Sequence, residues 1–127
     1  MTVLIVDDSP QFRELIRTVL AGLVDAVSEC ADGDEAVAAY GAQRPDWVLM
    51  DLQMARMGGL EATRRLLAAD RTARVLIVTD YDDVHWRAAA IEAGACGYVL
   101  KDNLLEVRRL LEPLDVLRGT ASVRATE

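Results

Sequence analysis

The chain has 127 residues, which is enough for one domain with a single hydrophobic core. Its 21 acidic residues outnumber 14 lysine and arginine residues, and the resulting net charge of −7 disfavours direct nucleic-acid binding, which needs a basic surface. No apolar run approaches the ~18 residues that a membrane span needs, and the N-terminus does not resemble a signal peptide. We therefore predict a cytoplasmic protein without membrane contacts.

Five short apolar runs are predicted to form the strands of a parallel sheet, because polar residues rarely interrupt them and such strands are covered on both faces. They are Val3–Val6, Ala26–Cys30, Trp47–Met50, Val75–Val78 and Gly97–Leu100. The two cysteines, Cys30 and Cys96, have no metal-ligand spacing, and we expect both to be small buried hydrophobic residues.

Helical patterns separate these runs, and the first of them is the clearest. Ser9 is a suitable N-cap and Pro10 suits the first helical position. Five apolar side chains then follow helical spacing and are expected to face the core: Phe12, Leu15, Ile16, Val19 and Leu20. The other helices are expected near residues 33–41, after the glycine pair 58–59, over 83–93 with Gly94 at the end, and over 103–113.

Five alternations of strand and helix predict an α/β fold, a doubly wound (βα)5 sandwich of the flavodoxin-like type. The expected five-stranded parallel sheet has the strand order 2-1-3-4-5. We assign residues 1–118 to this single domain and expect 119–127 to be a short flexible tail.

Polar residues stand where the predicted strands end. Asp7 and Asp8 follow the first strand, Asp51 the third, Thr79 the fourth and Lys101 the fifth. Sites in open α/β sheets form beyond the carboxyl ends of the strands, at the point where the strand order reverses. Strands one and three flank that point, so the three aspartates are expected to lie together.

Three adjacent carboxylates need compensating positive charge. Hard oxygen ligands without histidine or cysteine favour Mg²⁺, and such a site suits phosphoryl transfer. Asp51 is then the expected covalent nucleophile. Thr79 offers a hydroxyl to one phosphoryl oxygen and Lys101 offers a positive charge to another.

Several motifs together resemble the receiver domain of bacterial two-component response regulators, over about residues 2–118. The segments that carry the resemblance are Val3–Asp8, Met50–Met54, Gly58–Ala62, Val78–Thr79 and Gly94–Lys101. The Gly-Leu-Glu-Ala-Thr segment at 59–63 and the Lys-Asp pair at 101–102 are similar to the NarL/LuxR-type subfamily, whose receivers usually precede a DNA-binding helix-turn-helix domain.

The resemblance implies that Asp51 accepts a phosphoryl group from a sensor histidine kinase. It further implies that Asp8, Asp51 and the backbone carbonyl of Gln53 bind Mg²⁺, whereas Asp7 acts mainly through water. Intrinsic phosphotransfer and slow self-dephosphorylation are expected to accompany this site. Asp51, Thr79 and Lys101 would carry the chemistry.

The resemblance also implies a switch made of Thr79 and Tyr98. On phosphorylation Thr79 would move toward the phosphoryl group, and Tyr98 would turn inward behind it. The signalling face would be the fourth helix, the fifth strand and the fifth helix, and it would act through protein contacts or through a homodimer.

Three positions depart from the family pattern. Ala55 stands where a proline is usual, which loosens the backbone after the acceptor. Asp80 follows Thr79 where a small residue is usual, and its charge near the pocket is expected to change the phosphorylation or dephosphorylation rate. Asp102 replaces the commoner proline after Lys101, so no cis-proline is expected there.

Three other functions compete with a phosphorylation switch. A phosphorylation-independent interaction module is supported only by Ala55 and Asp80. The receiver part of a DNA-binding transcriptional regulator is the second. A flavin-binding protein of the same fold is excluded because Asp7 and Asp8 would repel the flavin phosphate, so no organic cofactor is expected.

Overall fold

The computed structural model describes residues 1–112, so the expected tail at 119–127 and the expected domain boundary at 118 lie outside the described residues. Strands and helices alternate along the whole described chain. In order they are β1 (Thr2–Val6), α1 (Pro10–Val19), β2 (Ala26–Cys30), α2 (Gly33–Gln43), β3 (Trp47–Met50), α3 (Gly59–Ala69), β4 (Val75–Thr79), α4 (Val84–Ala93), β5 (Gly97–Leu100) and α5 (Leu104–Leu111).

The five strands form one parallel sheet in the order β2-β1-β3-β4-β5, which confirms the predicted fold. The register aligns Val6 of β1 with Cys30 of β2 and with Met50 of β3. The N–H of Asp51 donates to the carbonyl of Val6 over 2.9 Å. The ends of β1 and β3 are therefore fixed beside each other, as the site prediction required.

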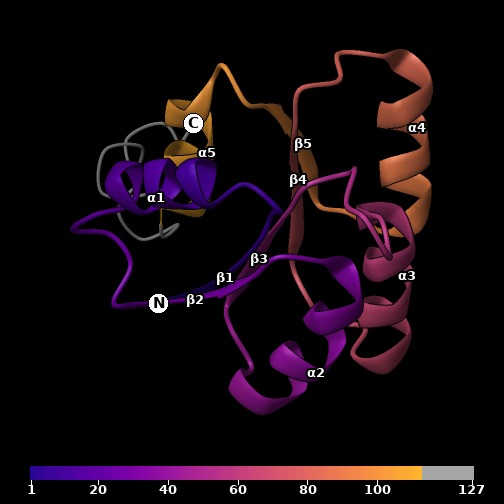
Figure 1. Cartoon of the computed structure of the whole chain (residues 1–127), viewed down its shortest axis with the longest axis horizontal. Coiled ribbons are helices and arrows are strands. Elements are labelled where there is room, and N and C mark those ends of the chain that lie inside the picture. Colours follow the sequence, from indigo (N-terminus) through magenta and orange to yellow (C-terminus); the bar gives the residue numbers. More distant parts are fainter. Residues whose placement is uncertain (113–127) are drawn as a thin grey trace, which may run out of the picture.

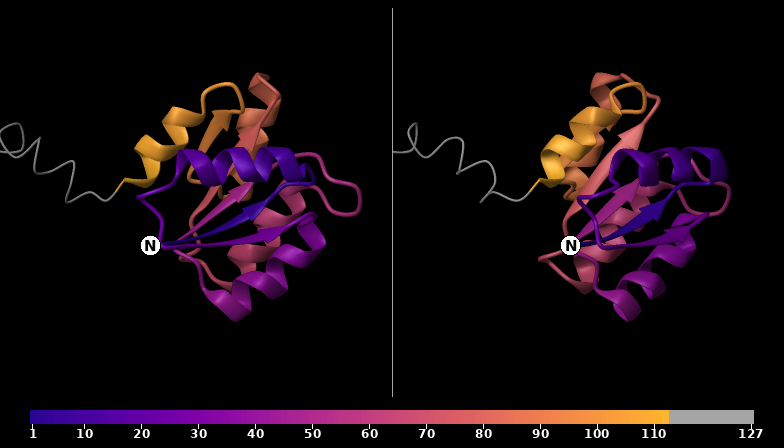
Figure 2. Two further views of the ribbon diagram at one scale, coloured as in Figure 1. Left: turned by 60° about the vertical axis from the view of Figure 1, so that its left-hand side comes forward. Right: turned by 90° about the vertical axis from the view of Figure 1, so that its left-hand side faces the viewer.

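Helices cover both faces of the sheet, with α1 and α5 on one side and α2, α3 and α4 on the other (Figures 1 and 2). Alternate residues of β1 point to opposite layers: Leu4 joins the core under α2–α4, while Ile5 joins the core under α1 and α5. Both side chains are fully buried, and each such burial contributes about 1.5–3 kcal/mol.

The predicted helix boundaries have the expected local causes. The Ser9 hydroxyl accepts the N–H of Phe12 over 3.1 Å, and Pro10 occupies the first turn of α1. Gly94 ends α4 with a φ of 105°, a left-handed conformation that favours glycine. The second helix continues to Gln43, two residues beyond its predicted end.

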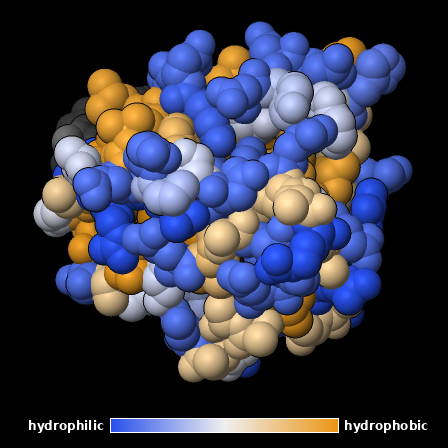
Figure 3. Space-filling model, viewed as in Figure 1, coloured by the Kyte–Doolittle hydropathy of each residue, from blue (hydrophilic) through white to orange (hydrophobic). Residues whose placement is uncertain are grey.

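Two burial predictions were wrong. Leu15 is 48% exposed, because its side chain lies in the wall of an open cleft and not in the core. Cys96 is exposed on the turn before β5, whereas Cys30 is buried as expected. Most of the surface seen in Figure 3 is hydrophilic, with smaller hydrophobic patches between the polar groups. Among the described helices, none has the length and apolar character of a membrane span.

Candidate functional site

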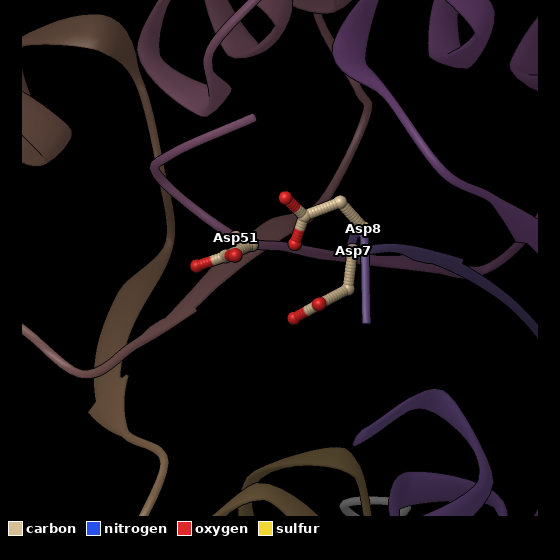
Figure 4. A group of neighbouring side chains, drawn as sticks. All are labelled: Asp7, Asp8 and Asp51. Carbon is tan, nitrogen blue, oxygen red and sulfur yellow. The ribbon is translucent and has the colours of Figure 1, made fainter. Parts of the chain in front are cut away.

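The carboxylates of Asp7, Asp8 and Asp51 gather at the ends of β1 and β3 (Figure 4). One oxygen from each carboxylate lies within 4.8 Å of the others. Asp7 and Asp51 are buried, while Asp8 is exposed to the cleft. The structure thus brings together the three acids that the strand-end pattern had predicted to meet.

Lys101 delivers its ammonium group to the same place from the end of β5. Its Nζ lies 2.8 Å from Oδ2 of Asp7 and 3.4 Å from Oδ2 of Asp51. The Lys101 side chain is only 13% exposed, and it is the only lysine of the chain. One positive charge therefore faces three carboxylates, which leaves the pocket with an excess of negative charge.

Burial and the neighbouring charge of Asp7 raise the pKa of Asp51 to about 6, although Lys101 and the N–H of Leu52 oppose the shift. Leu52 donates this hydrogen bond to Oδ1 of Asp51 over 2.8 Å. The pKa of Lys101 is also raised, because its two carboxylate partners outweigh the effect of its own burial. At neutral pH the pocket therefore holds an ammonium group beside a mostly ionised Asp51.

The chain packs closely behind Asp51. The N–H of Gly59 donates to the carbonyl of Leu52 over 2.8 Å, which folds the loop after β3 back onto the start of α3. A Cβ atom at Gly59 would lie 1.9 Å from the carbonyl oxygen of Asp51, so only glycine fits. The glycine pair before α3 therefore serves backbone packing behind Asp51.

Asp32, which the sequence prediction missed, anchors the same loop. Its buried carboxylate accepts the N–H groups of Arg56 over 2.8 Å and Met57 over 2.9 Å. It also accepts the N–H of Asp34 over 3.2 Å and so caps α2. Burial opposes the charge of Asp32, but these N–H donors hold its pKa at about 2. The loop that follows Ala55 is thus held by a charged hydrogen-bond acceptor.

An open cleft of about 610 Å³ gives access to the carboxylates. Gln53, the predicted backbone ligand, lies in its wall together with Asp8 and Asp80. Asp80 is exposed there, as the prediction of a charge near the pocket had required. Phe12 forms another part of the wall and places its ring centroid 4.3 Å from Nζ of Lys101.

Thr79 and Tyr98 do not line this cleft but meet at the backbone of Tyr81. The buried hydroxyl oxygen of Thr79 accepts the N–H of Tyr81 over 3.2 Å, while the Tyr98 hydroxyl donates to the Tyr81 carbonyl over 2.5 Å. The guanidinium carbon of Arg87 lies 4.7 Å from the centroid of the Tyr98 ring. One residue of the β4–α4 loop thus links the two predicted switch residues.

The peptide bond after Lys101 agrees with the prediction for this position. Residues 1–112 contain no cis peptide bond, and Asp102 continues the turn that leads from β5 toward α5. The N–H of Lys101 donates to the carbonyl of Thr79 over 2.8 Å, which fixes the end of β5 beside the end of β4.

Residues 3–114 match the model of the family described as the response regulator receiver domain. The chain belongs to this family. The receiver is 36% identical over 121 residues to the Bacillus subtilis "Uncharacterized transcriptional regulatory protein YxjL", covering 94% of this chain and 53% of the relative. It is 36% identical over 99 residues to the chemotaxis protein CheY of Halobacterium salinarum, covering 78% of this chain and 82% of CheY.

The receiver also resembles solved structures. The crystal structure of a LuxR-family two-component response regulator from Aurantimonas sp. SI85-9A1 matches with a TM-score of 0.81 and 36% identity, over 93% of this chain and 85% of the other. The chain spans about half the length of the first curated relatives, since its match covers 53% of YxjL and 49% of the transcriptional regulatory protein DegU of Brevibacillus brevis.

Proposed function

We propose that this receiver accepts a phosphoryl group on Asp51 from a sensor histidine kinase, in a reaction that requires Mg²⁺. The observation that carries the proposal is the position of Asp51, a buried carboxylate at the base of an open cleft, beside two further carboxylates and the only lysine of the chain. Family membership supports the same reaction.

The residues present fit a Mg²⁺ ion. Three carboxylates offer hard oxygen ligands within 4.8 Å of one another, and Lys101 alone leaves their charge incompletely compensated. Asp8, Asp51 and the backbone carbonyl of Gln53 are the proposed ligands, with Asp7 acting through water. The bound ion would neutralise charge on the carboxylates and on the incoming phosphoryl oxygens.

The proposed transfer uses one oxygen of ionised Asp51 as the nucleophile. This oxygen forms a bond to phosphorus while the bond from phosphorus to the donor breaks, and the leaving group keeps that electron pair. With its pKa raised to about 6, Asp51 is mostly ionised at neutral pH and more basic than an ordinary aspartate.

Lys101 and Thr79 have separate proposed roles around the new phosphoryl group. The ammonium of Lys101 already lies 3.4 Å from Asp51 and would pair with a phosphoryl oxygen. Thr79 now accepts a hydrogen bond from Tyr81, and its hydroxyl proton is available for another phosphoryl oxygen. Movement of Thr79 would break the link to Tyr81 and release Tyr98, the proposed second switch residue.

The proposed output face consists of α4, β5 and α5, acting through protein contacts or a homodimer. Val84 on α4 is 71% exposed and Leu105 on α5 is 75% exposed, so both helices offer apolar contacts. A second candidate output is transcription control through a DNA-binding domain of a longer protein. It is favoured by the transcriptional relatives, of which this chain covers about half.

A small phosphodonor tests the acceptor directly. After incubation with acetyl phosphate and Mg²⁺, intact-mass measurement should show one phosphoryl adduct on the wild type and none on Asp51→Ala. Chelation of Mg²⁺ should prevent the adduct. A wild type without an adduct would instead favour the phosphorylation-independent interaction module.

A further inference from the structure

The ammonium group of Lys101 has three close neighbours in the structure. Two are carboxylates, Asp7 at 2.8 Å and Asp51 at 3.4 Å. The third is the aromatic ring of Phe12 on α1, whose centroid lies 4.3 Å from Nζ. This distance falls within the ≈6 Å at which the negative face of an aromatic ring attracts a cation. Phe12 is the only phenylalanine of the chain.

These neighbours differ in what the proposed reaction does to them. Asp7 and Asp51 belong to the carboxylate group that fits Mg²⁺, and the phosphoryl group would be attached to Asp51 itself. Bound Mg²⁺ would therefore weaken the attraction of both carboxylates for Lys101, and after transfer the negative charge beside Lys101 would lie on the phosphoryl oxygens. The Phe12 ring carries no charge and binds no metal, so its attraction for the ammonium would remain.

We propose that Phe12 is a positioning residue that holds the Lys101 ammonium at the phosphoryl site through its ring while the carboxylates are engaged by Mg²⁺ and phosphate. This inference rests on the proposed function. Phe12 lies in the cleft wall, and its helix is anchored one residue further on, where the Arg13 guanidinium donates to the carbonyl of Asp7. This hydrogen bond fixes α1, and with it Phe12, beside the end of β1, which carries Asp7 and Asp8.

Phe12 also packs against the apolar core under α1 and α5, so its effect must be separated from simple filling of space. Replacement by leucine keeps an apolar side chain but removes the ring. Replacement by tryptophan keeps a ring with a stronger attraction for cations. Only the proposed cation–ring contact predicts opposite results for these two variants at Lys101.

The single lysine permits a direct structural test that needs no phosphorylation. Protein made with ¹³C-labelled lysine gives one set of side-chain signals, which report on Lys101 alone. In the wild type the ε-methylene protons should be shifted upfield by the Phe12 ring, and the shift should persist when Mg²⁺ is added. It should disappear in Phe12→Leu and remain in Phe12→Trp. An unchanged lysine spectrum in Phe12→Leu overturns the proposal.

Phosphorylation rates with acetyl phosphate and saturating Mg²⁺ provide the functional test. We expect Phe12→Leu to be slower by about threefold to tenfold, the range of a partly buried cation–ring contact, and Phe12→Trp to stay within about twofold of the wild type. Phe12→Met, another flexible apolar replacement without a ring, guards against a folding defect of the leucine variant and should be equally slow.

Equal rates for the wild type and both ring-free variants would overturn the positioning role of Phe12 alone. A wild type that forms no phosphoryl adduct would overturn the proposed function.

Discussion

Lys101 forms its shorter ion pair with Asp7, at 2.8 Å, and its longer one with Asp51, at 3.4 Å. Its charge is therefore shared, and Asp51 is compensated only in part. This sharing agrees with the raised pKa of Asp51, which burial and the charge of Asp7 cause and which Lys101 only reduces. Asp51 thus lies in an environment that disfavours its charged form.

The raised pKa of Asp51 predicts a pH-dependent cost in stability. A carboxyl group whose pKa is higher in the folded state, about 6 here against 3.8, stabilises the fold at low pH and loses that contribution as the pH rises through 6. The quantity to compare is the free energy of unfolding of Asp51→Asn minus that of the wild type. This difference should be about 1–2 kcal/mol more favourable to the variant at pH 7.5 than at pH 4.5. Urea unfolding in EDTA measures this, and a pH-independent difference would contradict it.

Mg²⁺ should stabilise the folded protein through the proposed ligands. At a concentration about ten times its dissociation constant, the ion should add roughly 1.4 kcal/mol to the free energy of unfolding. Asp8→Asn should lose most of this gain, and because Asp8 is exposed its removal leaves the core intact. Thermal unfolding with Mg²⁺ or with Na⁺ at matched ionic strength measures the effect. Equal stabilisation of both proteins would show that Asp8 is not a ligand.

Asp32 should stabilise the loop after Asp51 far more than its exposed neighbour Asp34 does. In Asp32→Asn an amide NH₂ would face the N–H of Arg56 or Met57, and the lost hydrogen bonds should cost about 1–3 kcal/mol. Asp34→Asn weakens only an exposed ion pair with the Arg56 side chain and should cost less than about 1 kcal/mol. Similar losses in urea unfolding of the two variants would refute the role of Asp32.

Asp80 should slow the approach of anionic phosphodonors, because its exposed carboxylate lies at the cleft. We expect Asp80→Ala to react with acetyl phosphate about threefold faster at low ionic strength, with a smaller gain at high salt. Glu92→Ala, which removes an exposed charge from α4, is the matched control and should react like the wild type. Equal rates for all three proteins would show that Asp80 has no influence on the donor.

The strands and the acidic site were predictable because their causes are local. Apolar runs marked the strands to within one residue at each end, and parallel strands necessarily bring their final residues to one edge. The positions of Asp7, Asp8 and Asp51 follow from that rule. The chemical roles assigned to these and the other site residues remain predictions, and those of Gln53 and Tyr98 came from family resemblance alone.

The errors and omissions concern contacts between distant segments. Helical spacing placed Leu15 in an apolar stripe, but it could not show that this side chain lies in the wall of an open cleft. Asp32 precedes a glycine and looks like an ordinary helix cap, and nothing near it indicates the hydrogen bonds to residues 56–57. The contact between Phe12 and Lys101 joins residues 89 positions apart, which no local pattern reveals.

Chemical mapping of the modified residue tests most directly whether Asp51 is the phosphoryl acceptor. Wild-type protein is treated with acetyl phosphate and Mg²⁺ and then reduced with borohydride, which converts an aspartyl phosphate to homoserine. Peptide sequencing by mass spectrometry should find homoserine at position 51 and unmodified aspartate at positions 7 and 8. Homoserine at either of the other positions, or its absence from position 51, would contradict the account.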